Sequence, residues 1–283
     1  KAETETDYES EVDESDIEEL FGHYERVNEG KDAVIGKVEV KSINRTSYEH
    51  FVGKDKAEQA ESDQAVKMLK IYSDTHAGQR EAEIHRKAYA AISEDSELEA
   101  RVPELNYCDE VTLAKEELKS RLESQGVGVS LDGSVEVILM DFIEGDDFAT
   151  YLYREIAKRH PKLERLHEVF EQGTIMPYNQ IVDQIGEALG SDTSNGDILY
   201  AFHKAVADYL YKEGFTLDRD FLSSLKQATA TLHNNKIFHN DLHERNVMME
   251  ETEQGMRPVI IDFGRSTGDI PETILERREA GML

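Results

Sequence analysis

The sequence predicts an α+β fold in which a small, strand-rich part precedes a larger helical part. Up to about residue 143 the apolar residues alternate in short stretches typical of strands, with one helical stretch among them. After Gly145 the apolar residues recur mostly at helical spacing, and a strand returns near the end of the chain. This order predicts a β-rich N-lobe over 20–143 and a helical C-lobe over 144–283, with a ligand in the cleft between them.

The strand-rich part contains four predicted elements. Residues 33–35 are apolar and residues 37–40 alternate charged residues with valine, on either side of Gly36, which predicts a hairpin. The other three elements are a strand over 64–70, a helix over 77–92 and a strand over 134–140. The helix is predicted because Ile84, Ala88 and Ile92 share one face.

The helical part contains one long stretch, 151–218, in which apolar residues form three stripes. The stripes are Leu163, Leu166, Val169 and Phe170, then Ile181, Ile185 and Leu189, then Leu199, Phe202, Val206 and Leu210. Each stripe has to be buried against something. A further helix over 221–232 ends at the polar residues 234–236.

Charge and composition exclude several classes of protein. Among 283 residues, 32 Lys and Arg stand against 60 Asp and Glu, so the net charge is 32 − 60 = −28. Such a chain repels nucleic acids and anionic membranes, and we expect neither as a partner. The single Cys108 excludes an intrachain disulfide and suits a reducing compartment. No apolar run is long enough to span a membrane. We therefore expect a cytoplasmic protein, or one in a host cytosol if it is a secreted effector.

Residues 1–19 form the most acidic segment, with ten acids and one base. Because such a composition buries little apolar surface, it predicts a disordered, solvated tail. An acidic docking or autoinhibitory segment is the alternative interpretation.

Two short segments near the C-terminal end carry chemistry. His239, Asp241 and Asn246 belong to an H-x-D-L-x-x-x-N segment, and the predicted strand 259–261 leads directly into Asp262-Phe263-Gly264. The order and spacing of these segments resemble the catalytic core of protein-kinase-like phosphotransferases. The resemblance implies a two-lobed protein-kinase-like fold that binds ATP and Mg²⁺, with Mn²⁺ as a substitute.

The resemblance also assigns roles to the residues of these segments. Asp241 orients the attacking hydroxyl, and Asn246 and Asp262 hold the metal ion with the hard oxygen ligands that it prefers. His243 stands where many Ser/Thr kinases have a lysine near the γ-phosphate. A competing interpretation takes His239 and His243 as a zinc pair at helical spacing, although the sequence offers no third ligand.

The phosphate-binding lysine is predicted on the strand over 64–70. Lys67 is preferred because Ala65 and Val66 precede it, as in the V-A-x-K strand of kinases. Lys70 is the alternative, and it lies on the opposite face of the strand. The partner carboxylate is expected on the following helix, where Glu81 shares a face with Ile84 and Ala88, whereas Glu83 points away.

The strand over 134–140 and the residues after it resemble the segment that receives adenine in kinases. Met140 then lies at the back of the pocket, and the backbone near Asp141 and Ile143 binds the base. The glycine-rich loop departs from the kinase pattern, because only Gly30 remains of the three expected glycines. Gly30 is expected to contact phosphate and Val34 to cover the adenine ring.

The expected activity is transfer of the γ-phosphoryl group of ATP to Ser or Thr hydroxyls of a protein. Nineteen residues follow Gly264, as in short bacterial effector kinases. Two alternatives stay open: a small-molecule kinase of the choline or aminoglycoside class, and a non-catalytic kinase-like scaffold. Asn240 replaces an arginine of many regulated kinases, which predicts activity without activation-loop phosphorylation. The helical insertion 151–218 is expected to dock a protein substrate or activator, or to add stability alone.

Overall fold

The fold is mixed, with antiparallel sheets and many helices. The computed structural model describes residues 12, 14–29, 33–52, 54, 57–58, 66–73, 75–113, 115–124, 127–129, 133–173, 176–190 and 198–268. Gly30, the predicted phosphate-binding glycine, lies outside the described residues, as does most of the acidic segment 1–19. No described helix is long and apolar enough to cross a membrane.

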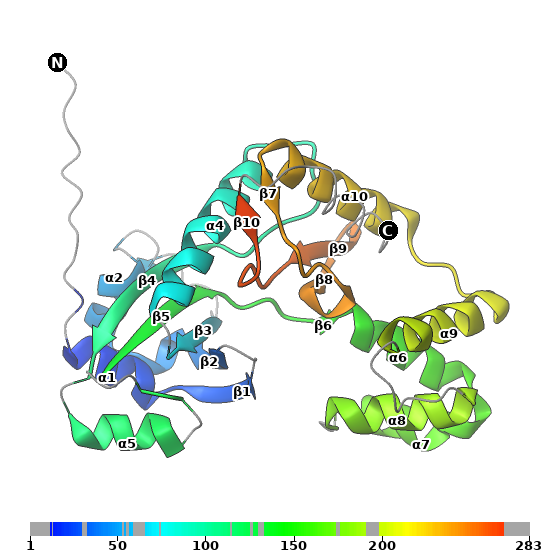
Figure 1. The fold of residues 1–283 in the computed structure, drawn as a ribbon, viewed down its shortest axis with the longest axis horizontal. Coiled ribbons are helices and arrows are strands. Elements are labelled where there is room, and N and C mark those ends of the chain that lie inside the picture. The colour runs from blue at the N-terminus through cyan, green and yellow to red at the C-terminus, as the bar shows by residue number, and fades with distance from the viewer. Residues whose placement is uncertain are drawn as a thin grey trace.

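The first half of the chain contains the strands of the larger sheet (Figure 1). Its elements are α1 (Glu14–Gly22), β1 (Glu25–Glu29), β2 (Ala33–Glu39), η1 (Val40–Ser42), α2 (Arg45–Val52), β3 (Val66–Tyr72), α4 (Thr75–Ser93), β4 (Leu105–Thr112), α5 (Glu116–Ser124) and β5 (Ser134–Asp141). The strands form one antiparallel sheet in the order β1-β2-β3-β5-β4.

The second half is mainly helical. Its elements are β6 (Asp146–Asp147), α6 (Phe148–Arg159), η2 (Pro161–Leu163), α7 (Glu164–Glu171), α8 (Tyr178–Leu189), α9 (Ile198–Lys212), α10 (Arg219–Asn234), β7 (Ile237–Phe238), η3 (Glu244–Asn246), β8 (Val247–Thr252), β9 (Gly255–Ile260) and β10 (Thr267–Gly268). Strands β6, β8 and β9 form a small sheet, and β7 pairs with β10.

The two faces of the five-stranded sheet pack against different helices. On one face, Leu69 of β3 and Leu139 of β5 share an apolar core with residues of α1, α2 and α5. On the other face, Tyr72 and Met140 pack with Ala82 of α4. Because side chains alternate along a strand, neighbouring residues of β3 face different helices. This alternation decides which residues of β3 reach the site.

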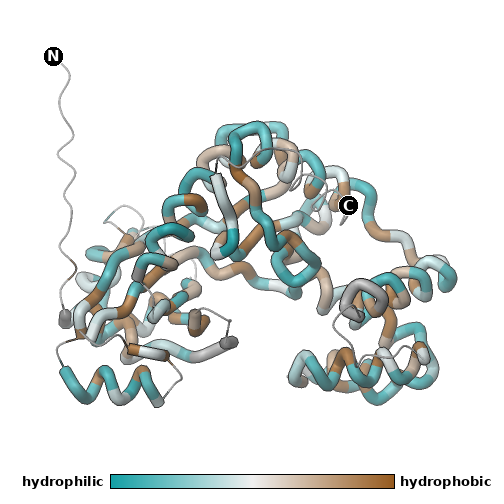
Figure 2. Tube along the Cα trace, in the orientation of Figure 1, coloured by the Kyte–Doolittle hydropathy of each residue, from teal (hydrophilic) through white to brown (hydrophobic). Residues whose placement is uncertain are grey.

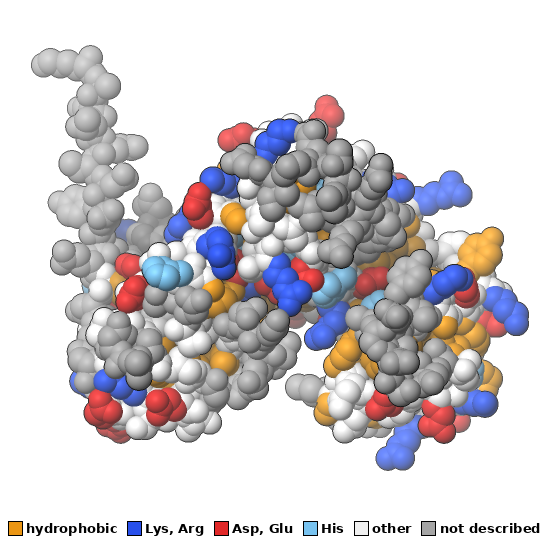
Figure 3. Space-filling view, in the orientation of Figure 1, with side chains coloured by type: hydrophobic (Ala, Val, Ile, Leu, Met, Phe, Trp, Pro, Cys, Tyr) orange, Lys and Arg blue, Asp and Glu red, His pale blue; other side chains and the backbone are white. Residues whose placement is uncertain are grey.

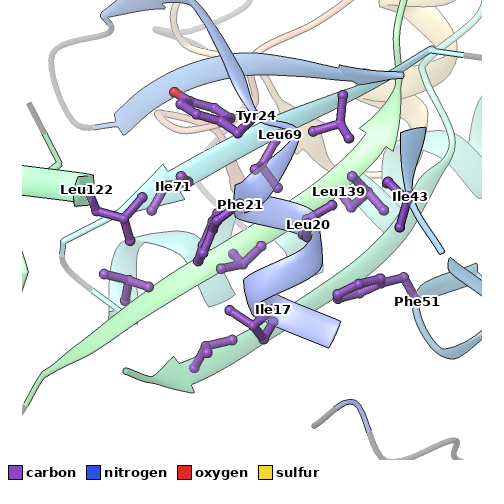
Figure 4. Packing of buried hydrophobic residues seen from close by; sticks show 14 of the residues in the cluster. Ile17, Leu20, Phe21, Tyr24, Ile43, Phe51, Leu69, Ile71, Leu122 and Leu139 are labelled. Carbon is purple, nitrogen blue, oxygen red and sulfur yellow. The ribbon is translucent and has the colours of Figure 1, made fainter. Parts of the chain in front are cut away.

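Residues 14–19, the last part of the segment 1–19 that was predicted as a disordered tail, belong instead to helix α1. The helix begins at Glu14, and its residues Ile17, Leu20 and Phe21 are buried against the sheet (Figure 4). Each such side chain contributes about 1.5–3 kcal/mol by leaving water. These apolar residues recur at i, i+3 and i+4, the spacing of a helix with one buried face. The average composition of the segment is dominated by the surrounding acids and does not show this pattern. Asp16, one of those acids, is itself buried and lies 2.7 Å from Nδ1 of His50.

The predicted hairpin around Gly36 is wrong, because 33–39 is the single strand β2. Gly36 lies under the ring of Tyr24, and a Cβ atom at this position would come within 2.0 Å of that ring. The glycine therefore allows an aromatic ring to approach the strand closely, and it makes no turn.

Helices α6 to α9 form a separate group at one end of the molecule (Figures 1 and 2). Their shared core includes Leu166, Ile185 and Phe202, one residue from each predicted stripe. The side chain of Leu199 lies outside the described residues. The stripes are therefore buried largely against one another. Their contribution to stability is enough to explain why apolar residues recur at helical spacing. Docking of a protein on this group stays a prediction.

Candidate functional site

The centre of the candidate site is a buried lysine between two carboxylates from distant elements. The Nζ atom of Lys70, on β3, lies 2.7 Å from Oε1 of Glu81 on α4 and 3.1 Å from Oδ1 of Asp262, which follows β9. The Lys70 and Glu81 side chains are 5% and 1% exposed, whereas that of Asp262 is 45% exposed. The three residues thus join the five-stranded sheet to the D-F-G segment.

Lys70, and not the predicted Lys67, forms this cluster. Helix α4 covers the sheet face that carries Lys70 and Tyr72, whereas Lys67 lies three residues earlier and on the opposite face. Lys67 instead donates a hydrogen bond of 2.7 Å to Asp141, its cross-strand neighbour on β5. Of the two candidate lysines, only Lys70 is placed beside the carboxylate on α4.

The structure places Glu81, and not Glu83, beside this lysine. Glu83 is exposed and pairs with Lys87 one helical turn later. Glu81 is buried and also accepts a hydrogen bond from the hydroxyl of Tyr72, a residue that the sequence analysis did not single out. Tyr72 could have been predicted to lie at the site, because it stands two residues after Lys70 and therefore on the same face of the strand.

Burial and the neighbouring charges have opposite effects on the ionisation of this cluster. Burial by itself favours a neutral lysine, but the adjacent Glu81 carboxylate and the other acids outweigh this effect and raise the pKa of Lys70. Burial opposes ionisation of Asp262 as well, yet the Lys70 ammonium and its hydrogen bond lower the pKa of this carboxyl. Both residues are therefore charged at neutral pH.

The loop between β7 and β8 brings Asp241 and Asn246 to the same region. The Asn246 side chain donates to the carbonyl oxygen of Asp241 over 2.9 Å. The backbone amide of Ile261, directly before Asp262, donates to the carbonyl oxygen of Asn246 over 3.0 Å. The Asp241 carboxylate lies 3.3 Å from the guanidinium of Arg265 and 3.9 Å from Nε2 of His243. Arg265 is a second residue that the sequence analysis missed.

The backbone at two of these positions adopts the left-handed conformation that favours glycine. Asp262 has φ 64° and Asn240 has φ 62°. This conformation costs a residue with a side chain about 1–2 kcal/mol, least for Asp and Asn. The Asn240 side chain donates to the carbonyl oxygen of Arg265 and, over 2.8 Å, to the hydroxyl of Thr267. It thereby holds the chain that follows the D-F-G segment.

Two histidine rings pack against the ring of Phe263 at steep angles and support the segment. The ring of Phe263 lies 5.2 Å from that of His85 on α4 and 5.0 Å from that of His239. All three side chains are buried. His239 bonds the carbonyl oxygen of Ile261 through Nε2, over 2.9 Å. The D-F-G segment is thus held both by α4 and by the loop between β7 and β8.

The donor set suits magnesium better than zinc. Asp262 offers a carboxylate, and Asn246 offers an amide oxygen because its amide nitrogen is taken by Asp241. Mg²⁺ prefers such oxygen ligands and binds with few protein ligands when phosphates supply the rest. The described residues include no cluster of three His, Cys, Asp or Glu side chains that could bind a metal. His239 points to a backbone carbonyl, which disfavours the zinc pair with His243.

Of the residues that were predicted to bind adenine, some lie on the same side of the sheet as Lys70 and others do not. Met140 lies on the sheet face of Lys70, packed with Tyr72. The amide of Asp141 is already bonded to the carbonyl oxygen of Glu104, whereas the amide of Ile143 has no hydrogen bond within the described chain. Val34 is buried in the core with α1 and does not face the site; its neighbour Ile35 pairs with Lys70.

Charged and histidine side chains gather in the middle of the face shown in Figure 3, over the region of β8 and β9.

Comparisons with known proteins add little to this geometry. No family model matches the sequence, and no curated protein matches it. Among solved structures, the kinase PK-1 of Cydia pomonella granulovirus matches with a TM-score of 0.38 and 12% identity. The match covers 90% of this chain and 56% of the viral kinase chain. This similarity is too low to assign the fold, so the site is interpreted from its own residues.

Proposed function

We propose that this protein is an ATP- and Mg²⁺-dependent phosphotransferase that acts on hydroxyl groups, with a protein as its acceptor. The observation that carries the proposal is the buried Lys70–Glu81 pair in contact with Asp262. A lysine held by a helix carboxylate and a metal-binding aspartate at the end of a strand are the two parts that a kinase active site has to assemble.

The residues divide the chemistry among them. Lys70 neutralises the phosphates of ATP, and Glu81 keeps the ammonium in place. Asp262 and Asn246 would hold the metal ion, which would neutralise charge on the phosphates. Asp241 accepts the proton of the attacking hydroxyl. The oxygen of that hydroxyl forms a bond to the γ-phosphorus, the bond to the β-phosphate oxygen breaks, and ADP leaves.

The end of β5 is the proposed adenine site. Met140 shares a sheet face with Lys70, and the amide of Ile143 is available as a donor to the base. Asp141 contributes structurally, because its side chain binds Lys67 and its amide binds Glu104. His243, at 43% exposure, stands beside Asp241 and faces solvent, where an acceptor or the γ-phosphate approaches.

The acceptor class is tested by fractionation. The protein is incubated with γ-labelled ATP, Mg²⁺ and a cell lysate, and the products are separated into protein and small-molecule fractions. Label on Ser or Thr of a protein supports the proposal. Label only in the small-molecule fraction assigns a kinase of the choline or aminoglycoside class, and no transfer by the folded protein supports a non-catalytic scaffold.

A further inference from the structure

We propose that Tyr153 and His203, on two helices of the α6–α9 group, are positioning residues for the catalytic loop. They hold η3, the turn that ends at Asn246, through the carboxylate of Glu244. This inference rests on the proposed function, since it assigns the helical group a part in phosphoryl transfer. It differs from a docking role, because it concerns turnover and not the choice of a protein partner.

A chain of polar contacts leads from the helical group to the loop. The Tyr153 hydroxyl lies 3.0 Å from Nε2 of His203 and 3.2 Å from the hydroxyl of Tyr178. On the other side of the imidazole, Nδ1 of His203 lies 3.4 Å from Oε2 of Glu244. Tyr153 is 1% exposed, and the side chains of His203 and Glu244 are 18% and 22% exposed. The contacts are therefore largely shielded from water. Polar interactions are stronger in such a shielded place than in water.

A second contact holds the next residue of the same turn. The guanidinium of Arg245 lies over the ring of Tyr178, 4.2 Å from its centre, within the range of a cation–π interaction. Glu244 and Arg245 are the two residues directly before Asn246. Both of them are thus held by side chains of the α6–α9 group, while Asn246 itself bonds back to Asp241.

The protonation of His203 fits this role. Burial lowers its pKa, and the Glu244 carboxylate only partly offsets that effect. The neutral imidazole has one N–H and one acceptor nitrogen. The tautomer with its proton on Nδ1 leaves Nε2 to accept the hydroxyl hydrogen of Tyr153, while Nδ1 makes a longer polar contact, 3.4 Å, with Glu244. Together, these contacts restrict the orientation of the turn.

The backbone supplies the geometric reason why this support matters. Strand β6 pairs with β8, which begins directly after Asn246, and α6 follows β6 without a break. Figure 1 shows α6 extending from this small sheet to the other helices. The helical group is therefore attached to the chain immediately next to the metal-binding residue. A small displacement of a catalytic group lowers turnover strongly, so a fixed turn is needed.

The test compares two hydroxyl deletions in the same helical group. Tyr153→Phe removes a link of the proposed chain. Tyr209→Phe is the matched control, because the Tyr209 hydroxyl donates to the carbonyl oxygen of Arg159 inside the group, 3.2 Å away, and is not part of the chain. His203→Ala breaks the chain at its centre, and His203→Gln restores one donor and one acceptor.

We expect Tyr153→Phe and His203→Ala to lower kcat by about threefold to tenfold, the effect of one lost hydrogen bond, with little change in KM for ATP. His203→Gln should recover most of the loss, and Tyr209→Phe should behave as wild type. Amide hydrogen exchange over residues 243–247 should accelerate by about threefold to tenfold in the first two variants only. This second measurement needs no activity.

Two results overturn the inference. One is an equal kcat for Tyr153→Phe, His203→Ala and Tyr209→Phe in the presence of clear phosphoryl transfer by the wild type. The other is an unchanged rate of amide hydrogen exchange over residues 243–247 in both Tyr153→Phe and His203→Ala. If the wild type transfers no phosphate, the proposed function fails, and the exchange measurement still decides whether the helices hold the loop.

Discussion

Lys70 and Glu81 form a buried ion pair, with 2.7 Å between Nζ and Oε1, that joins the central strand β3 to helix α4. Two buried charges are costly to desolvate, and such a pair is weak evidence for stability by itself. Lys70 also contacts Asp262 on the other side. The proposed phosphate-binding role of the ammonium rests on this position between two carboxylates, which also makes α4 part of the candidate site.

Replacement of Lys70 should be far more harmful than replacement of Lys67. Lys70→Met removes the phosphate-binding charge, and we expect turnover to fall by about a hundredfold or more. It also leaves Glu81 buried without its cation, which should lower the free energy of unfolding by about 3–5 kcal/mol. Steady-state transfer from ATP and urea unfolding measure the two effects.

Lys67→Met is the matched control, since it removes a lysine from the same strand. Its partner Asp141 is 26% exposed and has Arg101 at 3.6 Å as a second cation. Turnover should therefore stay close to that of the wild type. A Lys67 variant that loses activity while Lys70→Met keeps it would restore the original assignment of Lys67.

Asp241→Asn should separate turnover from nucleotide binding. The amide keeps the shape of the side chain but cannot accept the proton of the hydroxyl, so we expect kcat to fall by about 10²- to 10⁴-fold. ATP affinity, measured by calorimetry, should stay near the wild-type value, because no phosphate-binding group is changed. Asp218→Asn is the control: it keeps an N-cap residue at the start of α10. Parallel loss of ATP binding in Asp241→Asn would contradict the role given to Asp241.

Phosphorylation of the chain after the D-F-G segment should be unnecessary for activity. Asn240 fills the place of a phosphate-binding arginine, and its side chain already bonds Arg265 and Thr267. Phosphatase-treated protein should therefore turn over at the same rate as untreated protein. A large loss that rephosphorylation within residues 265–283 restores would show that this interpretation is wrong.

Acid should destabilise the protein through His85. Burial lowers the pKa of His85 below its ordinary value of 6.5, and Nε2 lies 2.7 Å from the carbonyl oxygen of Pro103. Below pH 6.5 the unfolded chain binds a proton at this histidine and the folded chain does not. The free energy of unfolding therefore falls as the pH falls toward the folded-state pKa, by at most about 1.4 kcal/mol per pH unit.

Urea unfolding of the wild type and of His85→Gln between pH 7.5 and 5.5 measures this contribution. Glutamine keeps a donor for Pro103 but does not titrate, so the variant should lose less stability on acidification. Parallel curves for the two proteins would show that His85 does not contribute.

The helix and strand positions near the site were well predicted from the sequence. The expected helix 77–92 corresponds to α4, and the expected strand 134–140 corresponds to β5. In both cases the periodicity of the apolar residues is local and strong. The partner residue Glu81 followed from the same argument, because a helix face is fixed by spacing within one element.

The strand faces were not predictable in the same way. Lys67 and Val34 were each assigned to the site, and both lie on the opposite sheet face, whereas Lys70 and Ile35 are paired on the site's face. Neighbouring residues of a strand point to opposite faces, and which face meets α4 depends on pairing with distant strands. Helix α1 was missed for another reason, since acids surround its apolar stripe. The boundary between N-lobe and C-lobe stays a prediction.

The most direct test of the account is phosphoryl transfer by Asp262→Asn compared with the wild type. Asparagine tolerates the left-handed backbone of this position, φ 64°, so the variant should still fold, although it loses the carboxylate and its charge contact with Lys70. With γ-labelled ATP and Mg²⁺, the account predicts labelled acceptor from the wild type and none above background from Asp262→Asn. Labelling by the folded variant at the wild-type rate would contradict the account.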